Sequence, residues 1–200
     1  MNILVDLYRY RTLSVDQIRN VHFGDKKRYA YHRLYQLKKD GLVESVQVVR
    51  LGENRHGGCY YITEKGIEAI GEYEKLDQVR RARDNKVSGP LIQHIIELNE
   101  LYVQLSPFGW QFIPSREVKA KYGMNRSALV KGSLIDRDNK EYAVYLLEEK
   151  SRDDTIEQIT REIQTHAFEH VLILSKGKES YFDMKQALRR VMIAGTVNIL

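Results

Sequence analysis

The order of elements expected in the first 74 residues is the feature that most constrains the fold. Apolar residues recur there at helical spacing in three short segments, and two β-type runs then flank a turn that contains three glycines. This order predicts a winged helix-turn-helix domain over residues 1–74. The expected elements are helices at 2–11, 15–21 and 26–39, strands at 42–51 and 59–62, and a further helix from residue 64.

Capping residues support these boundaries. Ser14 is a good N-cap for the second helix, and Asp25 can cap the third. Gly41 is placed to end the third helix, because glycine readily adopts the left-handed conformation found after helices. Thr63 is expected to cap the helix that starts at Glu64.

The remainder of the chain predicts a helical linker at 75–89 and a mixed α/β domain at 90–200, so the fold class is α+β. Pro90 suits the first turn of a helix at 91–105. That helix has an apolar face made of Leu91, Ile95, Leu98, Tyr102 and Leu105, and Ile92, Ile96 and Val103 lie beside it. Because the apolar arc is wide, we expect the helix to be buried on more than one side. Further elements are expected as strands at 110–113, 133–135, 142–148, 170–174 and 197–200, and as helices at 153–166 and 180–192.

The distribution of charge points to a polyanionic partner. The net charge of +5 lies entirely within residues 1–65, which hold 12 Lys and Arg against 7 Asp and Glu. Such a concentration of positive charge is typical of proteins that contact phosphates. No apolar run is long enough to span a bilayer, and the single cysteine, Cys59, fits a reducing compartment. We therefore expect a cytoplasmic protein with no membrane partner.

Helix 26–39 is the candidate DNA-reading element. Its apolar stripe is Ala30, Leu34 and Leu37, and it contains six basic residues and no acid. A recognition helix reads base edges mainly with its N-terminal residues, and a wing contacts the flanking backbone. The candidate DNA-binding residues are Lys26, Lys27, Arg28, Tyr31, His32, Tyr35 and Lys39 of the helix, and Asn54, Arg55 and His56 of the expected wing at 53–58.

Several sequence runs are shared with a known family. They are Leu7-Tyr8-Arg9-Tyr10-Arg11, Arg33-Leu34 with Leu37 and Gly41-Leu42-Val43, Tyr61-Ile62-Thr63 with Gly66, and Pro90-Leu91 with His94, Asn99 and Tyr102. In these runs the chain resembles the replication-relaxation family, whose members are winged-helix proteins of plasmids and phages. The resemblance implies a role in plasmid DNA relaxation, replication or regulation.

A second motif lies in the α/β half. Glu148-Glu149-Lys150 resembles the acid-x-Lys element of restriction-endonuclease-like nucleases, in which carboxylates bind Mg²⁺ and the lysine activates water. The partner carboxylate expected before the preceding strand is absent, and Lys131 stands there instead. We therefore expect a degenerate, inactive nuclease-like scaffold. The alternative is a metal-dependent nuclease with Asp136, Glu148 and Lys150 as its catalytic residues.

The sequence predicts a non-enzymatic, sequence-specific double-stranded DNA-binding protein of a plasmid or phage. It would act as a transcriptional regulator or as a replication or relaxation accessory factor, without a cofactor or metal. Because helix-turn-helix proteins commonly read two half-sites, we also expect a homodimer.

Overall fold

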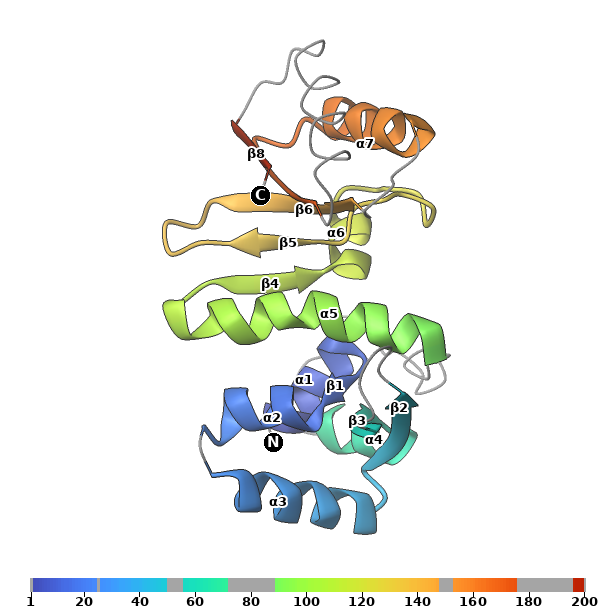
Figure 1. The fold of residues 1–200 in the computed structure, drawn as a ribbon, viewed down its shortest axis with the longest axis vertical. Coiled ribbons are helices and arrows are strands. Elements are labelled where there is room, and N and C mark those ends of the chain that lie inside the picture. The colour runs from blue at the N-terminus through green and yellow to red at the C-terminus, as the bar shows by residue number, and fades with distance from the viewer. Residues whose placement is uncertain are drawn as a thin grey trace. The chain divides into compact units, whose positions relative to one another are not determined.

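In the computed structural model the protein is an α+β fold made of two compact units, Met1–Gln104 and Leu105–Leu200. Its described residues contain seven α-helices and two β-sheets (Figure 1). None of the described helices has the length and apolarity needed to cross a membrane. The structure describes residues 2–24, 26–49, 56–71, 89–147, 153–175 and 196–199.

The first unit combines five helices with a small antiparallel sheet. The sheet has the strand order β1-β3-β2, with Leu13 opposite Tyr60 and Val43 opposite Ile62. Its elements are α1 (Asn2–Tyr10), β1 (Leu13–Ser14), α2 (Val15–His22), α3 (Lys27–Lys39), β2 (Val43–Val49), β3 (His56–Ile62), α4 (Glu64–Gly71) and α5 (Gly89–Leu105).

The start of α2 is fixed by a capping box. The Ser14 hydroxyl accepts a hydrogen bond from the backbone N–H of Gln17 over 3.1 Å, and the Gln17 side chain accepts one from the backbone N–H of Ser14 over the same distance. Two N–H groups that have no partner within the helix are satisfied in this way. The prediction that Ser14 caps this helix is confirmed.

The apolar stripe predicted for α3 is confirmed, since Ala30 and Leu34 are fully buried and Leu37 is 2% exposed. The helix ends at Lys39 and is terminated by Gly41, whose φ of +74° is left-handed. The N–H of Leu42 reaches back to the carbonyl of Leu37 over 2.9 Å. The expected cap is different, because Lys26 occupies the N-cap position without a side-chain bond. Asp25 itself lies outside the described residues.

At Gly66, near the start of α4, the backbone lies very close to the backbone of Leu42, which follows α3. The Thr63 hydroxyl accepts the N–H of Gly66 over 3.1 Å and donates to the carbonyl of Gly41 over 2.7 Å, which confirms the predicted cap. A Cβ atom at Gly66 would lie 2.2 Å from the carbonyl oxygen of Leu42. Only glycine allows the two backbones to come this near.

Helix α5 buries part of the wide apolar arc that the sequence predicted, including Ile92 and Val103. Leu91 is 45% exposed, whereas Ile92 and Asn99 are buried. Ile92 forms a small apolar cluster with Cys59, against which Val46 and Ile96 pack. On the helix, Asn99 lies between Ile95 and Ile92, so this polar residue is buried within the apolar arc.

Polar contacts attach α5 to the first unit. The Asn99 amide donates to the carbonyls of Tyr10 and Thr12 over 3.1 and 2.8 Å, across the left-handed Arg11 (φ +70°). The Gln17 amide donates to the carbonyl of Ile96 over 2.7 Å. The sequence had assigned residues 90–105 to the second domain, whereas the helix through Gln104 belongs to the first compact unit.

The second unit is a five-stranded mixed sheet with the order β4-β5-β6-β7-β8. The strands from β4 to β6 are antiparallel, and β6, β7 and β8 run parallel, with α7 between β6 and β7 in the chain. The elements are η2 (Ser106–Phe108), β4 (Gln111–Pro114), α6 (Ser115–Lys121), β5 (Gly132–Ile135), β6 (Glu141–Leu147), α7 (Asp153–His166), β7 (His170–Ser175) and β8 (Thr196–Ile199).

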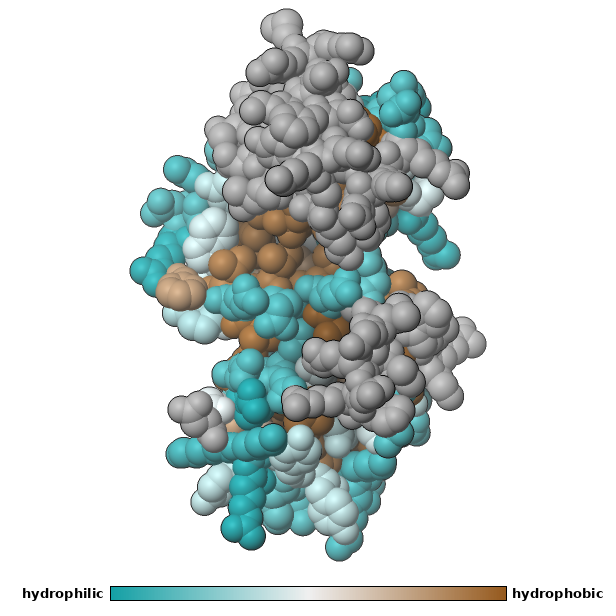
Figure 2. Space-filling view, viewed as in Figure 1, coloured by the Kyte–Doolittle hydropathy of each residue, from teal (hydrophilic) through white to brown (hydrophobic). Residues whose placement is uncertain are grey.

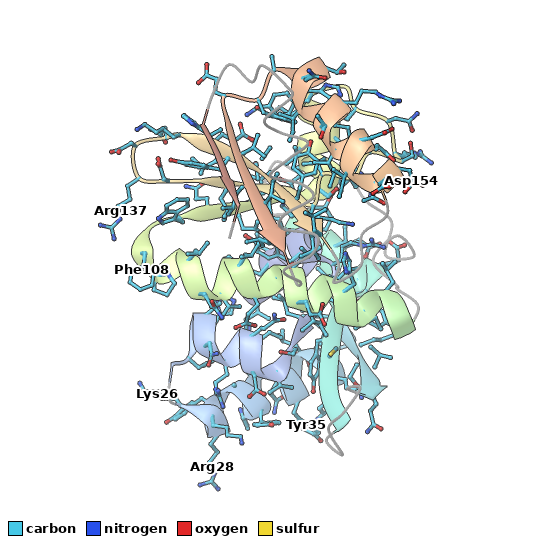
Figure 3. The ribbon with its side chains drawn as sticks, turned by 45° about the horizontal axis from the view of Figure 1, so that its top comes forward. Lys26, Arg28, Tyr35, Phe108, Arg137 and Asp154 are labelled. Atoms are coloured by element: carbon cyan, nitrogen blue, oxygen red, sulfur yellow. The ribbon has the colours of Figure 1, made fainter. Side chains whose placement is uncertain are left out.

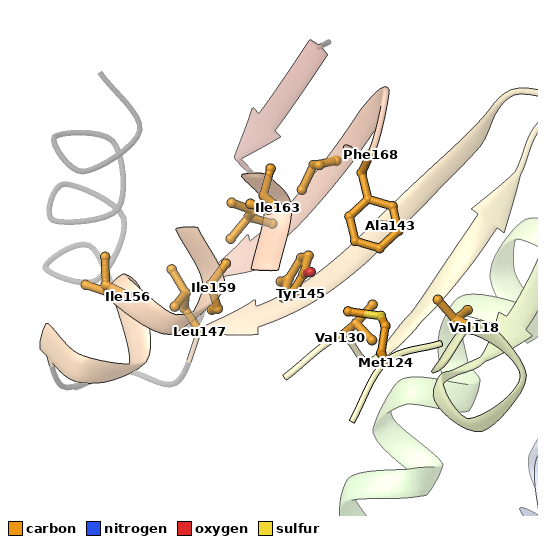
Figure 4. Close-up of a cluster of buried hydrophobic side chains, with 12 residues drawn as sticks. Val118, Met124, Val130, Ala143, Tyr145, Leu147, Ile156, Ile159, Ile163 and Phe168 are labelled. Atoms are coloured by element: carbon orange, nitrogen blue, oxygen red, sulfur yellow. The ribbon is translucent and has the colours of Figure 1, made fainter. Parts of the chain in front are cut away.

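One face of this sheet forms the main core of the second unit (Figure 4). Helix α7 contributes Ile156, Ile159 and Ile163 to it, in the segment where the sequence predicted a helix. The sheet contributes buried residues of β6 and β7, and α6 contributes Val118. The cluster consists of Val118, Met124, Val130, Ala143, Tyr145, Leu147, Ile156, Ile159, Ile163, Phe168, Val171 and Ile173.

Strand β3 is longer than expected, and two expected helices lie outside the described residues. The returning strand of the first unit starts at His56 rather than Cys59, so Gly57 and Gly58 belong to β3 and not to the turn. The linker helix expected at 75–89 and the helix expected at 180–192 lie in segments outside the described residues, except for Gly89, which begins α5.

Candidate nucleic-acid interface

The exposed side of α3 carries a dense set of cations. The helix and its N-cap hold six basic residues and no acid, and all six side chains are exposed. Figure 3 shows Lys26 and Arg28 extending from the helix away from its neighbours. In the space-filling view, the surface over α3 is hydrophilic to near neutral (Figure 2). The six are Lys26, Lys27, Arg28, Arg33, Lys38 and Lys39.

A single ridge points directly away from the buried stripe. Successive residues turn by about 100° around a helix, so positions four, three and four apart align along one side. Opposite Ala30, Leu34 and Leu37 this rule places Arg28, His32, Tyr35 and Lys39, and all four are exposed. The structure thus brings four of the predicted site residues into one line along the helix.

One flank of α3 faces the β2–β3 hairpin. The Lys38 ammonium donates to the Ser45 hydroxyl of β2 over 2.7 Å. Tyr31 lies close enough to Tyr60 of β3 to affect it: burial, and then the charge of Tyr31, raise the pKa of Tyr60. Lys27 sits 6.0 Å from the centre of the Tyr31 ring. These contacts place Lys27, Tyr31 and Lys38 on the hairpin side of the ridge.

Three tyrosines of this helix are exposed, and only two of them are among the predicted site residues. Tyr31 is 49% exposed and Tyr35 is 64% exposed, as expected for an outward face. Tyr29, at 67%, was missed together with the exposed Arg33. Both lie on the flank away from the hairpin. Helical projection alone could have found them, since neither position falls on the apolar stripe.

The residues predicted to form a wing are described only in part. Val49 pairs with His56, so β2 and β3 form a hairpin that residues 50–55 connect. Asn54 and Arg55 lie outside the described residues. The backbone of His56 begins β3, but the position of its side chain is not among the features described.

The Replication-relaxation family model matches residues 4–120, which is more than half of the chain. The chain belongs to the Replication-relaxation family. The match confirms the resemblance seen in the sequence, and it includes α3, the β2–β3 hairpin and α5. No curated protein and no solved structure matches this sequence.

In this Replication-relaxation protein, Asp136 is engaged in the turn between β5 and β6. Its Oδ1 accepts the backbone N–H groups of Asp138 and Lys140, each over 2.9 Å, and Oδ2 accepts the Tyr142 hydroxyl over 3.3 Å. Desolvation raises the pKa of Asp136, but these hydrogen bonds outweigh it and the net shift is downward. Asp136 therefore acts as a turn-stabilising residue.

Of the alternative catalytic set, only Asp136 lies among the described residues. Asp136 lies beside the start of β6, whereas the chain leaves that strand at Leu147. Glu148 and Lys150 lie outside the described residues.

Within the described residues of this protein, no group of three or more His, Cys, Asp or Glu side chains could hold a metal ion. Cys59 is 2% exposed and packs against Ile92 in an apolar cluster.

Proposed function

We propose that this Replication-relaxation protein binds double-stranded DNA through α3, as a winged helix-turn-helix unit. The observation that carries the proposal is the acid-free, exposed basic surface of α3, opposite a fully buried apolar stripe. Phosphate groups neutralised by such a surface release condensed counterions, which drives association. Helices α2 and α3 would form the helix-turn-helix pair, with α3 in the major groove.

The roles of individual residues follow from their positions. Arg28 and His32 are the N-terminal members of the outward ridge, so they would meet base edges, and arginine suits the O6 and N7 acceptors of guanine. Lys38 and Lys39 would contact phosphates near the end of the helix. The β2–β3 hairpin, with Asn54, Arg55 and His56, would be the wing on the flanking backbone.

The biological role proposed is that of a plasmid or phage protein acting in replication, relaxation or transcription control. Family membership supports an association with plasmid replication. We also propose a homodimer, because two helix-turn-helix heads read half-sites about one helical turn apart. Light scattering should then give about twice the chain mass of 23.4 kDa, and a particle of single-chain mass at micromolar concentration would contradict the dimer.

A charge-reversal pair tests DNA binding. In the double variant Lys27→Glu with Arg28→Glu, we expect loss of binding to a random-sequence duplex at 50 mM salt, measured by fluorescence anisotropy. The matched control reverses two exposed cations of the second unit, Arg126 and Lys140, and changes the net charge equally. Equal loss in both variants would show that net charge, and not α3, controls binding.

Salt dependence gives a second measure of the same interface. The logarithm of the binding constant should fall steeply with the logarithm of salt concentration for the unaltered protein, by about 0.9 for each phosphate contacted. The α3 variant should show a shallower slope. A flat response in the unaltered protein would favour a protein-interaction module over phosphate contact.

A further inference from the structure

The described part of the chain exposes five large apolar side chains, and three of them are tyrosines of α3. Leu91 and Phe108 are the other two, and each stands on a different element. Aromatic rings left in water along one helix are unfavourable unless a partner covers them, because each ring carries a large apolar surface. The α3 surface therefore has an apolar component in addition to its charge.

Tyr31 and Tyr35 form the relevant pair. They are four residues apart, so they are neighbours on the helix surface. Tyr35 stands on the outward ridge, in the helix half that follows Arg28 and His32 (Figure 3). Tyr31 lies toward the hairpin, with Lys27 over its ring and Tyr60 nearby. A tyrosine has only two side-chain torsions to fix on binding, so such rings make contacts at low entropic cost.

The chemistry of the major groove supplies a matching apolar group. Thymine is distinguished there by its 5-methyl group, and apolar side-chain contact is the means by which proteins read it. Arginine and histidine at the start of the same helix suit polar base edges instead. A helix that carries both basic side chains and the exposed rings of Tyr31 and Tyr35 is therefore suited to a site that presents thymine methyl groups beside polar base edges.

The arrangement of the rings argues against stacking on single-stranded bases. Stacking proteins place aromatic rings along a groove that follows the strand. On α3, Tyr29 lies about 160° around the helix from Tyr31, so the rings do not form one platform. The two neighbouring rings of Tyr31 and Tyr35 stand on a convex surface, which fits the concave groove of a duplex.

We propose that Tyr31 and Tyr35 are specificity-determining residues that contact the 5-methyl groups of thymines in the major groove. The inference rests on the proposed function, since it requires α3 to enter a duplex. It extends that function from a basic DNA-binding surface to one that prefers thymine-bearing sites. The phenol rings carry this preference, and the cations of α3 carry general affinity.

The test compares two duplexes that differ only in the methyl group. A random-sequence duplex is enriched by selection on the full chain, and the winning 20-bp sequence is synthesised with thymine or with deoxyuridine at every T position. We expect the unaltered protein to bind the deoxyuridine duplex about 4- to 15-fold more weakly, corresponding to the loss of one or two methyl contacts. Equal affinities for the two duplexes would overturn the inference.

Variants assign the effect to the rings. The double variant Tyr31→Ser with Tyr35→Ser should bind both duplexes with nearly equal affinity, whereas the corresponding double change to Phe should keep the thymine preference. Tyr29→Ser is the matched control on the opposite flank and should leave the ratio unchanged. A preference that persists in the double Ser variant would contradict the assignment.

Other outcomes separate this inference from the proposed function. Failure of the unaltered protein to bind either duplex would remove the proposed function itself. Binding to both duplexes without discrimination would remove only the thymine contact. Tighter binding to the single strand than to the duplex would replace groove reading with base stacking and would overturn the inference.

Discussion

The hydroxyl of Tyr102 on α5 donates a hydrogen bond to Oδ2 of Asp6 on α1 over 2.7 Å. The Tyr102 ring also stacks on Tyr10, with the ring centres 4.2 Å apart. Nε2 of His22, at the end of α2, lies 2.9 Å from the same Asp6 oxygen, close enough for ion pairing but outside hydrogen-bond geometry. Three helices of the first unit therefore meet at one carboxylate.

Replacing Tyr102 with phenylalanine should destabilise the first unit. The change removes the hydrogen bond, which is partly buried, but keeps the ring, and a hydrogen bond to a charged group contributes about 1.5–3 kcal/mol. We expect the free energy of unfolding to fall by about this amount, measured by urea titration with circular dichroism. The exposed Tyr29→Phe is the control and should change stability by less than about 0.5 kcal/mol.

The same contact predicts a dependence on alkaline pH. Burial and the hydrogen bond to Asp6 raise the pKa of Tyr102 well above its ordinary value of 10.0. The stabilisation is therefore complete below pH 10 and is lost as the pH rises toward the folded-state pKa, because the unfolded chain ionises first. The stability difference between the unaltered protein and Tyr102→Phe should shrink from pH 9 to pH 12. A constant difference would contradict this explanation.

Gly66 should not accept a side chain. An alanine Cβ there would approach the Leu42 carbonyl oxygen to 2.2 Å and Ile62 Cγ1 to 2.6 Å, so α4 would have to move away from the end of α3. We expect Gly66→Ala to lose about 2–4 kcal/mol of stability, measured by thermal or urea unfolding. Gly71→Ala, in the same helix with no atom within 4 Å, should be neutral or slightly stabilising. Similar results for both variants would show that the close approach is unimportant.

Glu141 should control part of the acid stability of the second unit. Burial alone would raise its pKa, but hydrogen bonds from Lys121, Ser133 and Tyr122 outweigh burial and lower the pKa below 4.5. The stabilisation is present above pH 4.5 and is lost as the pH falls through the folded-state pKa. Glu141→Gln should lower the free energy of unfolding by about 1–2 kcal/mol at pH 7. In this variant the free energy of unfolding should also fall less steeply as the pH drops below 4.5.

Trp110 is a suitable probe of that prediction, because it is the only tryptophan and lies in the second unit, 5.6 Å from the Tyr142 ring. Its fluorescence during urea unfolding at pH 3 to 7 would report this unit separately. The exposed Glu169→Gln is the control. If the free energy of unfolding of Glu141→Gln fell as steeply at acid pH as that of the unaltered protein, other carboxylates would determine the acid stability.

Local signals were sufficient for much of the fold. Ser14 and Gln17 fix the start of α2 through bonds between near neighbours, and Gly41 ends α3 through its own backbone conformation. Helix α7 could be predicted because its isoleucines recur at helical spacing. In contrast, α6 has Val118 as its single buried residue, so no apolar period marks it.

Contacts between distant residues could not be read from the pattern. On α5 the polar residue Asn99 is buried, and its partners are backbone carbonyls about 90 positions earlier. For the candidate site, the outward ridge of α3 follows from helical projection, whereas the hairpin flank depends on the contact of Lys38 with Ser45 in another element. The position of Asp136 followed from the expected turn, but its bonds to that turn required the structure.

The attachment of α5 also determines where the chain can be divided. A fragment ending at residue 74 would keep α1 to α4 but would remove the covering of Cys59 by Ile92 and the side chain that bonds the carbonyls of Tyr10 and Thr12. Such a truncated protein would expose apolar surface and aggregate. An expression plasmid for the isolated DNA-binding part should therefore extend to Gln104.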